Sequence, residues 1–368
     1  MKIQKGECYP YLLDWKDYVD ENTTVIIDSD QLAYVSAAAN ESRTIEVIHK
    51  ASGNKKEFKT RTEFWGNKKN SLGGWLQDTN LQREVKGQTL FTKEDFEIID
   101  IQTAQPLEYC LSNIKSKLNH ILDHLGLTQY KCILGGKNNF RLKLQAPNQY
   151  KSNRDDTLRP LQLKDAREYI IKHHKGVVVD NVEADDLLAI YGRATYDSFK
   201  ETGKFKYVVV SFDKDNLTMP TFLFNNYSEE GKLKHPIPML VDEDIGTLFL
   251  DKNKVKGYGF KFKCFQLIYG DPSDGIQPYQ NFKIRFGETS AYKLIQPCKT
   301  KQECLQVVVD KYKEWFPEGV KFTNWDGQEI SMTTGQWMNN IYRMIHMLQS
   351  KNDKSSIFSL VKDLGVKV

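Results

Sequence analysis

Tyr207-Val208-Val209-Val210-Ser211-Phe212-Asp213-Lys214-Asp215 joins a short run of β-branched residues to a pair of acids. Similar runs, each short enough for a buried strand, occur at Thr24 to Ile27, Lys131 to Leu134 and Val177 to Val179. Between the first two of these runs, Leu and Ile residues recur at helical spacing from Leu107 to Leu125. Strands that alternate with helices predict an α/β fold with a mainly parallel central sheet flanked by helices.

Acidic residues cluster near the ends of apolar runs. Besides Asp213 and Asp215, the chain has Asp28, the cluster Glu183-Ala184-Asp185-Asp186 and the cluster Asp271-Pro272-Ser273-Asp274. Sites in open parallel sheets form beyond the carboxyl ends of the strands, so we expect these acids to converge. Packed carboxylates raise one another's pKa unless cations neutralise them, and hard oxygen ligands suit Mg²⁺ or Mn²⁺. The acids therefore predict metal-dependent hydrolysis of phosphate esters, although a helix dipole or an ordinary turn explains one or two of them.

Basic residues are concentrated in one segment of a chain whose formal net charge is only +4. Between residues 137 and 175, ten Lys or Arg residues accompany four Asp or Glu residues. A segment of this kind predicts contact with a polyanionic substrate. A solvated charged helix is the alternative interpretation.

Several motifs occur in the order found in a known family. They are Val25-Ile26-Ile27-Asp28, Phe140-Arg141, Tyr150-Lys151-Ser152-Asn153-Arg154, Glu183-Ala184-Asp185-Asp186, Ser211-Phe212-Asp213-Lys214-Asp215 and Gly270-Asp271-Pro272-Ser273-Asp274. In these motifs the chain resembles bacteriophage 5′-to-3′ exonucleases of the flap endonuclease superfamily, which are related to the 5′-nuclease domain of bacterial DNA polymerase I. The resemblance implies a PIN-like 5′-nuclease fold that hydrolyses DNA near 5′ ends, flaps, nicks or junctions, and also RNA in RNA–DNA hybrids.

The resemblance also implies roles for individual residues. A first Mg²⁺ or Mn²⁺ ion would be held by Asp28, Glu183, Asp185 and Asp186, and a second by Asp213, Asp215, Asp271 and Asp274. Lys151 and Arg154 would approach the scissile phosphate, and Tyr150 would stack on the neighbouring base. A helical arch over residues 137–175 would contact DNA through Lys137, Arg141, Lys143 and Arg159.

Two features depart from the family pattern. The family has an acidic ligand after the strand that precedes the arch, where this chain has Gly136, and Asp30 is a candidate to replace that ligand. Residues 270–296 resemble only the second half of a helix-hairpin-helix. In the family this motif binds duplex phosphates, often around a monovalent cation such as K⁺, and here the contacts would come from Gly287, Thr289, Ser290 and Lys293.

The expected domain organisation is a nuclease core over residues 1–296 and a helical C-terminal extension over residues 297–368. A β-hairpin-rich segment over about residues 41–100 interrupts the core, with Arg43 to Ile48 and Glu57 to Phe64 as the arms of the hairpin. The aromatic residues of this segment either form its small core or, with Lys68 and Lys69, make a stacking surface for a single strand or a partner protein.

Composition excludes several other classes of protein. No apolar run approaches the ~18 residues of a membrane span, and residues 1–20 resemble a short amphipathic helix without a signal-peptide core. The six cysteines form no C-x-x-C pair, so we expect reduced thiols and a cytoplasmic protein, in the host cell if the protein is viral. We expect a monomer that works on DNA alongside replication proteins. His120 and His124 have a zinc-binding spacing but lack an evident third ligand.

Two other functions stay open at this stage. A ribonuclease can be built on the same acidic core. Alternatively, Gly136 marks a site that no longer turns over, which would leave a protein that binds DNA junctions.

Overall fold

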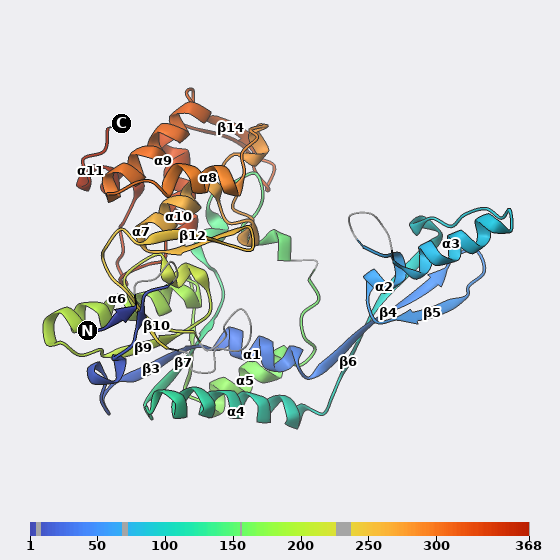
Figure 1. Ribbon diagram of the computed structural model, residues 1–368, viewed down its shortest axis with the longest axis horizontal. Coiled ribbons are helices and arrows are strands. Elements are labelled where there is room, and N and C mark those ends of the chain that lie inside the picture. The colour runs from blue at the N-terminus through green and yellow to red at the C-terminus, as the bar shows by residue number, and fades with distance from the viewer. Residues whose placement is uncertain (5–8, 68–72, 155–156, 226–236, 368) are drawn as a thin grey trace. The chain divides into compact units, whose positions relative to one another are not determined.

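The computed structural model describes residues 1–4, 9–67, 73–154, 157–225 and 237–367 (Figure 1). The chain divides into two compact units. The first contains residues 1–32, 117–158 and 167–368, and the second contains residues 33–116 and 159–166. All eight predicted metal ligands belong to the first unit.

Within the described residues, the central sheet of the first unit has the strand order β1-β2-β11-β10-β9-β3-β7-β8. The strands are β1 Ile3–Gln4, β2 Tyr11–Leu12, β3 Thr24–Asp28, β7 Tyr130–Gly135, β8 Gly176–Val179, β9 Tyr207–Val210, β10 Thr221–Phe224 and β11 Met239–Val241. From β10 to β8 neighbouring strands are parallel, and β11, β2 and β1 extend the sheet beyond β10 in antiparallel pairs. The predicted mixed α/β fold with a mainly parallel sheet is confirmed.

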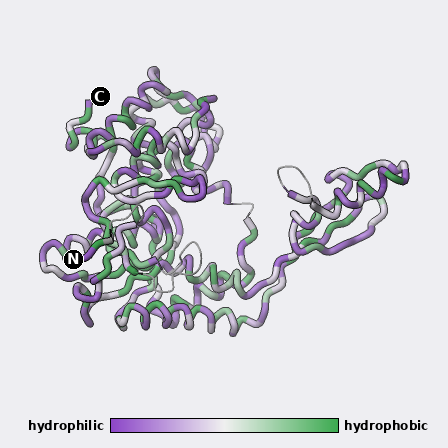
Figure 2. Tube along the Cα trace, in the orientation of Figure 1, coloured by the Kyte–Doolittle hydropathy of each residue, from purple (hydrophilic) through white to green (hydrophobic). Residues whose placement is uncertain are grey.

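Burial explains why the central strands form. Val25, Ile26 and Ile27 of β3 are almost fully buried between β7 and β9, so this strand needs apolar residues on both faces. Figure 2 shows hydrophobic residues gathered in this part of the first unit. The register pairs Ile27 with Val210 and Asp28 with Ile133, which places Asp28 beside the carboxyl end of β9.

Four helices accompany these strands among the described residues: α1 Ser29–Ala38, α4 Leu107–Leu125, α5 Leu163–His173 and α6 Ala184–Thr202. The helix predicted from Leu107 to Leu125 is confirmed at both ends. In α6, Ala184 and Leu188 pack with Ile26, Ile133 and Val209 of the sheet. This packing holds the acidic first turn of α6 near the ends of β3 and β9.

The rest of the first unit packs around α7. Its elements are β12 Thr247–Asp251, β13 Lys254–Tyr258, α7 Gly259–Tyr269, α8 Glu288–Ile295, α9 Lys301–Trp315, β14 Val320–Thr323, β15 Glu329–Met332, α10 Thr334–Ile345 and α11 Ile357–Asp363. Leu267 and Ile268 of α7 share one core with Tyr312 and Trp337, so residues 297–368 pack directly on the preceding helices. The β14–β15 hairpin was not predicted.

The segments expected to form an arch and a hairpin contain few helices. The described part of residues 137–175 has 3-10 turns at Phe140–Lys143 and Ser152–Arg154 before α5. Leu144 and Tyr150 are buried in the core around α7, so this part of the segment lies against the protein. In residues 270–296, 3-10 turns at Pro272–Asp274 and Gln280–Phe282 precede the single helix α8.

The second unit contains an antiparallel sheet in the order β5-β4-β6, formed by β4 Glu41–His49, β5 Lys55–Phe58 and β6 Phe96–Ala104. The helices α2 Arg61–Trp65 and α3 Trp75–Val85 complete its core. A hairpin forms at the predicted turn, but its second arm, expected over Glu57 to Phe64, runs over Lys55–Phe58, because the Thr60 side chain caps α2. Phe64 is fully buried against the Trp75 ring, as the core interpretation predicted, while Lys68 and Lys69 lie outside the described residues.

Two further observations concern the N-terminal residues and the helices. The amphipathic helix expected over residues 1–20 is wrong: where this segment is described, it forms the short strands β1 and β2 and a 3-10 turn at Trp15–Tyr18. β2 pairs with β11 instead.

Across the described parts of the chain, we find no helix with the length and apolarity that crossing a membrane requires.

Candidate active site

The acidic residues gather beyond the carboxyl edge of the parallel strands. Asp28 ends β3, Glu183, Asp185 and Asp186 open α6, and Asp213 follows β9. The Ser211 hydroxyl oxygen links two of these segments, since it lies 3.4 Å from Asp28 Oδ2 and accepts a 3.0 Å hydrogen bond from the Asp213 amide. The 3-10 turn at Pro272–Asp274 brings the last acidic cluster to the same region.

Four of the predicted acids have a cationic partner. Lys151 Nζ lies 2.5 Å from Glu183 Oε1, and Lys214 Nζ lies 2.6 Å from Asp271 Oδ2. Arg141 binds Asp186, and Arg154 binds Asp274. Burial by itself would raise the pKa of Asp271, but the Lys214 ammonium and the Ser273 donors hold that pKa below its ordinary value.

The other four acids form no ion pair with any described residue. They are Asp28, Asp185, Asp213 and Asp215. Burial and the charge of Asp213 raise the pKa of Asp28 to about 6. Burial also raises the pKa of Asp185 and Asp215 well above the ordinary value, with Asp213 as the strongest like-charged neighbour of both. The charged form of these four carboxylates is therefore disfavoured unless a cation binds beside them.

The chemistry of these side chains fits a hard divalent cation, which prefers carboxylate oxygens. In the conformation described, no group of three acidic, His or Cys side chains among the described residues is arranged to hold a metal ion. Binding therefore requires some of the carboxylates to turn toward a common point. The unpaired Asp28, Asp185 and Asp213 are the side chains best suited to this, because no ion pair has to break first.

Tyr150 and Lys151 lie against the acids. The Tyr150 hydroxyl is 2.8 Å from Asp274 Oδ2 and 3.0 Å from Glu183 Oε2, and only 6% of the residue is exposed. The ring is packed in the core around α7, so it presents no face on which a base can stack. Lys151 adopts a left-handed backbone conformation, with φ at 62°, and its ammonium lies between Glu183 and Asp274.

Arg141 has a different environment from the one predicted. Its side chain is 0% exposed and forms a bidentate pair with Asp186, with distances of 2.6 and 2.8 Å. Because the side chain has no exposed surface, it cannot contact a DNA phosphate. Arg141 therefore holds the acidic turn of α6 from inside the protein.

The remaining basic and polar residues predicted to bind DNA are accessible. Lys137 and Lys143 are exposed in the first unit, and Arg159 is exposed in the second. Gly287, Thr289, Ser290 and Lys293 are exposed around the N-terminal end of α8.

The environment of Gly136 explains why an acid is absent there. A Cβ atom at this position would lie 2.2 Å from Asp180 Oδ1 and 2.7 Å from the carbonyl oxygen of Val179. Asp180 was missed by sequence reasoning, although it directly follows β8 as Asp28 ends β3. Asp30, the proposed replacement, binds Arg167 and accepts a 2.6 Å hydrogen bond from the Gly135 amide.

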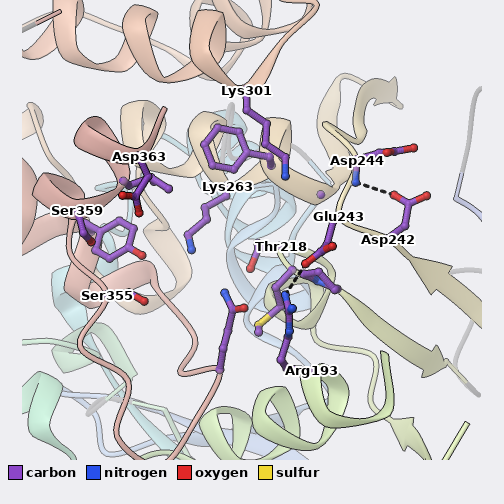
Figure 3. A pocket seen from close by; sticks show the side chains of 17 residues that line it. Arg193, Thr218, Asp242, Glu243, Asp244, Lys263, Lys301, Ser355, Ser359 and Asp363 are labelled. Carbon is purple, nitrogen blue, oxygen red and sulfur yellow. Dashed lines mark hydrogen bonds and ion pairs between the residues drawn. The ribbon is translucent and has the colours of Figure 1, made fainter. Parts of the chain in front are cut away.

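Other candidate sites lie apart from the acids. A cavity of about 220 Å³ is lined by Arg193, Lys263 and Lys301, among others, and by none of the eight predicted ligands (Figure 3). His124 stacks on the Phe224 ring at 5.2 Å, and the described residues supply no third ligand for zinc beside it.

Comparison with known proteins gives only distant structural likenesses. No protein-family model matches the chain, and no curated protein matches it. Among solved structures, a mutant of the bacteriophage T5 5′-exonuclease is 14% identical at a TM-score of 0.36, covering 69% of this chain and 84% of that one. The T5 flap endonuclease complex with DNA and metal ions is 14% identical at a TM-score of 0.38, with coverages of 69% and 89%. A T5 5′-exonuclease structure with bound zinc is 15% identical at a TM-score of 0.33, with coverages of 64% and 91%.

Proposed function

We propose that this chain is a divalent-metal-dependent 5′-nuclease that hydrolyses DNA phosphodiesters near 5′ ends or at junctions between single-stranded and duplex DNA. The observation that supports it most is the convergence of acids from four separate segments beyond one edge of a parallel sheet. Four of these acids form no ion pair with a described residue, and burial raises the pKa of each, so a cation that binds them would offset the cost of their charge.

In this proposal Asp28, Asp185 and Asp213 hold one Mg²⁺ or Mn²⁺ ion, with Glu183 joining them when Lys151 moves away. Asp215, Asp271 and Asp274 hold a second. When bound, a pair of such ions activates a water molecule and neutralises charge on the phosphate and the leaving oxygen. The protein contributes the rigid edge of the sheet, which keeps the carboxylates close together before any ion arrives.

The two cations beside the acids give a route for substrate to enter. Lys151 and Arg154 now neutralise Glu183 and Asp274, and Arg154 is about half exposed. We propose that both side chains exchange a carboxylate for the scissile phosphate when DNA and metal bind. A carboxylate released in this way is then available to a cation, so substrate and metal binding would support each other.

Contacts outside the acidic cluster would set the position of the DNA. Lys137, Lys143 and Arg159 are proposed to bind phosphates of the 5′ strand, and the exposed residues at the start of α8 to bind the duplex, with K⁺ as a candidate ion there. Backbone amides at a helix N-terminus favour phosphate, which supports this assignment. RNA–DNA hybrids are proposed as additional substrates.

The test is a cleavage assay with purified protein, Mg²⁺ and 5′-labelled substrates. A 5′ flap, a nicked duplex, a blunt duplex, an RNA–DNA hybrid and single-stranded RNA are compared side by side, with EDTA as the control. The proposal expects metal-dependent release of 5′ fragments from DNA. Cleavage of RNA alone would favour a ribonuclease, and tight junction binding without any cleavage would favour a binding protein.

A further inference from the structure

Resting on the proposed function, we infer that Arg141 and residues 344–353, here called the C-terminal strap, position the acidic turn of α6 for metal binding. In this view Asp186 is a positioning residue, although the sequence suggested a metal ligand. The inference assigns a part in the active site to a segment about 160 residues away from Asp186 in the chain.

Arg141 joins three segments in the interior. Its Nη1 and Nη2 atoms donate to the two carboxylate oxygens of Asp186. Its Nε donates to the carbonyl oxygen of Met344 at 3.0 Å, and Nη2 also donates to that of His346 at 2.7 Å. A planar guanidinium with donors on both edges can hold a carboxylate and two carbonyl groups at fixed angles, which an ammonium group cannot do.

The contacts of Asp186 leave little room for a metal ion. Oδ2 accepts from Arg141 and from the Glu183 amide at 3.0 Å, while Oδ1 accepts from Arg141 and from the Leu348 amide at 3.1 Å. Each oxygen therefore has two donors, and the residue is fully buried. Its role is to fix the first turn of α6, which also carries Glu183 and Asp185.

The strap is itself anchored in the core. Lys263 of α7 lies with its Nζ 2.7 Å from His346 Nδ1, and His346 Nε2 lies 3.1 Å from Asp353 Oδ2. The Asp353 carboxylate also accepts a 2.7 Å hydrogen bond from the Gln349 amide. Figure 3 shows Lys263 extending from α7 toward the segment that carries Ser355. These contacts connect α7 to the strap, and Arg141 connects the strap to Asp186.

The coupling between the strap and metal binding must act in both directions, so it can be tested without any substitution. If the strap favours the metal-binding arrangement of α6, then metal binding must stabilise the strap by the same free energy. Hydrogen–deuterium exchange of the DNA-free wild-type protein is measured with and without Mn²⁺. We expect amides in residues 344–353 to exchange at least about tenfold more slowly with Mn²⁺, and amides of α9 to be unchanged. Unchanged exchange in the strap of a protein that binds Mn²⁺ would overturn the inference.

Substitutions test the same coupling through affinity. Mn²⁺ binding is measured by calorimetry for Arg141→Lys and Asp186→Asn, with melting temperatures recorded for each. Arg343→Met, which removes an exposed arginine of α10, is the matched control. We expect Arg141→Lys and Asp186→Asn to weaken Mn²⁺ binding about 10- to 100-fold at unchanged stoichiometry, as losses of residues that orient ligands do, and the control to bind like wild type.

The outcomes separate the inference from the proposed function. Loss of one Mn²⁺ site in Asp186→Asn would make Asp186 a ligand, and wild-type affinity in both variants would show that the strap does not act on the site. Either result overturns the inference while leaving the nuclease intact. A wild-type protein that binds no Mn²⁺ and cleaves no DNA would overturn the proposed function, and the inference with it.

Discussion

Individual carboxylates in this site differ mainly in whether they form an ion pair. Glu183, Asp186, Asp271 and Asp274 are paired, while Asp28, Asp185, Asp213 and Asp215 are not. The unpaired acids are destabilised by burial and by one another, which is the usual cost of a preformed cation site. Neutralising an acid without an ion pair should therefore stabilise the metal-free protein, whereas neutralising a paired acid should destabilise it.

Asp213→Asn should remove cleavage and stabilise the protein that contains no metal. Asp213 raises the pKa of Asp28, Asp185 and Asp215, so its neutral replacement relieves repulsion. The amide oxygen of Asn can still accept the hydrogen bond from the Asp215 amide. We expect the cleavage rate to fall more than about 100-fold, beyond the usual effect of residues that only orient ligands. Single-turnover kinetics and urea unfolding in EDTA measure the two effects, and wild-type cleavage would contradict the assignment.

Lys151→Ala should slow cleavage without weakening metal binding. Its ammonium lies at Glu183 and Asp274; burial lowers the Lys151 pKa, but those carboxylates outweigh it and hold the pKa above its ordinary value. Removing it exposes negative charge to an incoming cation, so Mn²⁺ affinity should rise or stay the same. The single-turnover rate at saturating Mg²⁺ should fall about 10- to 1,000-fold if Lys151 contacts the phosphate in the transition state. An unchanged rate would remove Lys151 from the chemical step.

At the scale of elements, the turn between β7 and Lys137 is restricted by its neighbour β8. Gly136→Ala should destabilise the fold, because the added Cβ would lie 2.7 Å from the backbone carbonyl oxygen of Val179. The side chain of Asp180 can move aside, but the backbone of β8 cannot. We expect the free energy of unfolding to fall by about 1–3 kcal/mol, measured by urea denaturation. Wild-type stability would show that the turn relaxes freely.

The strap should make stability depend on pH. Burial and the charges of Lys263 and Arg141 lower the pKa of His346 to about 4, despite its bond to Asp353. As pH falls below about 6.5, His346 therefore becomes protonated in the unfolded chain while it stays neutral in the folded chain. The free energy of unfolding consequently decreases as pH falls from about 6.5 toward 4. Asp353, whose pKa is lowered, titrates below this window, and Lys263, with a pKa of about 8, titrates above it.

Comparison with His346→Asn isolates this effect. The carboxylates are the same in both proteins, so the difference between the free energies of unfolding of wild type and variant reports on His346. Between pH 7 and pH 5 the wild type should lose about 1–2 kcal/mol more than the variant. Urea unfolding at several pH values measures this, and parallel pH profiles for the two proteins would show that folding does not shift the pKa of His346.

Across the whole molecule, the sequence predicted the features that depend on local pattern. The strands β3, β7, β8 and β9 and the helix α4 follow from runs of β-branched residues and from helical spacing. Acids placed directly after strands identified most of the residues that meet at the edge of the sheet. The hairpin in the second unit followed from alternation around a Gly-Asn turn.

The features that sequence reasoning missed depend on contacts between distant residues. Arg141 looked like an arch residue, and only its pairing with Asp186 and with two carbonyl groups near residue 345 shows it to be internal. Tyr150 looked like a stacking platform because its burial against α7 is not visible in its own segment. Lys214 was given no role of its own from the sequence, yet it neutralises Asp271, nearly sixty residues further along the chain.

The most direct test of the account is anomalous diffraction from a crystal grown with Mn²⁺. It locates the ions without any assumption about activity. We expect strong peaks among the carboxylates of Asp28, Asp185 and Asp213, a second position near Asp215, and Asp186 still bound to Arg141. A structure at high Mn²⁺ concentration with no peak at these carboxylates would contradict it.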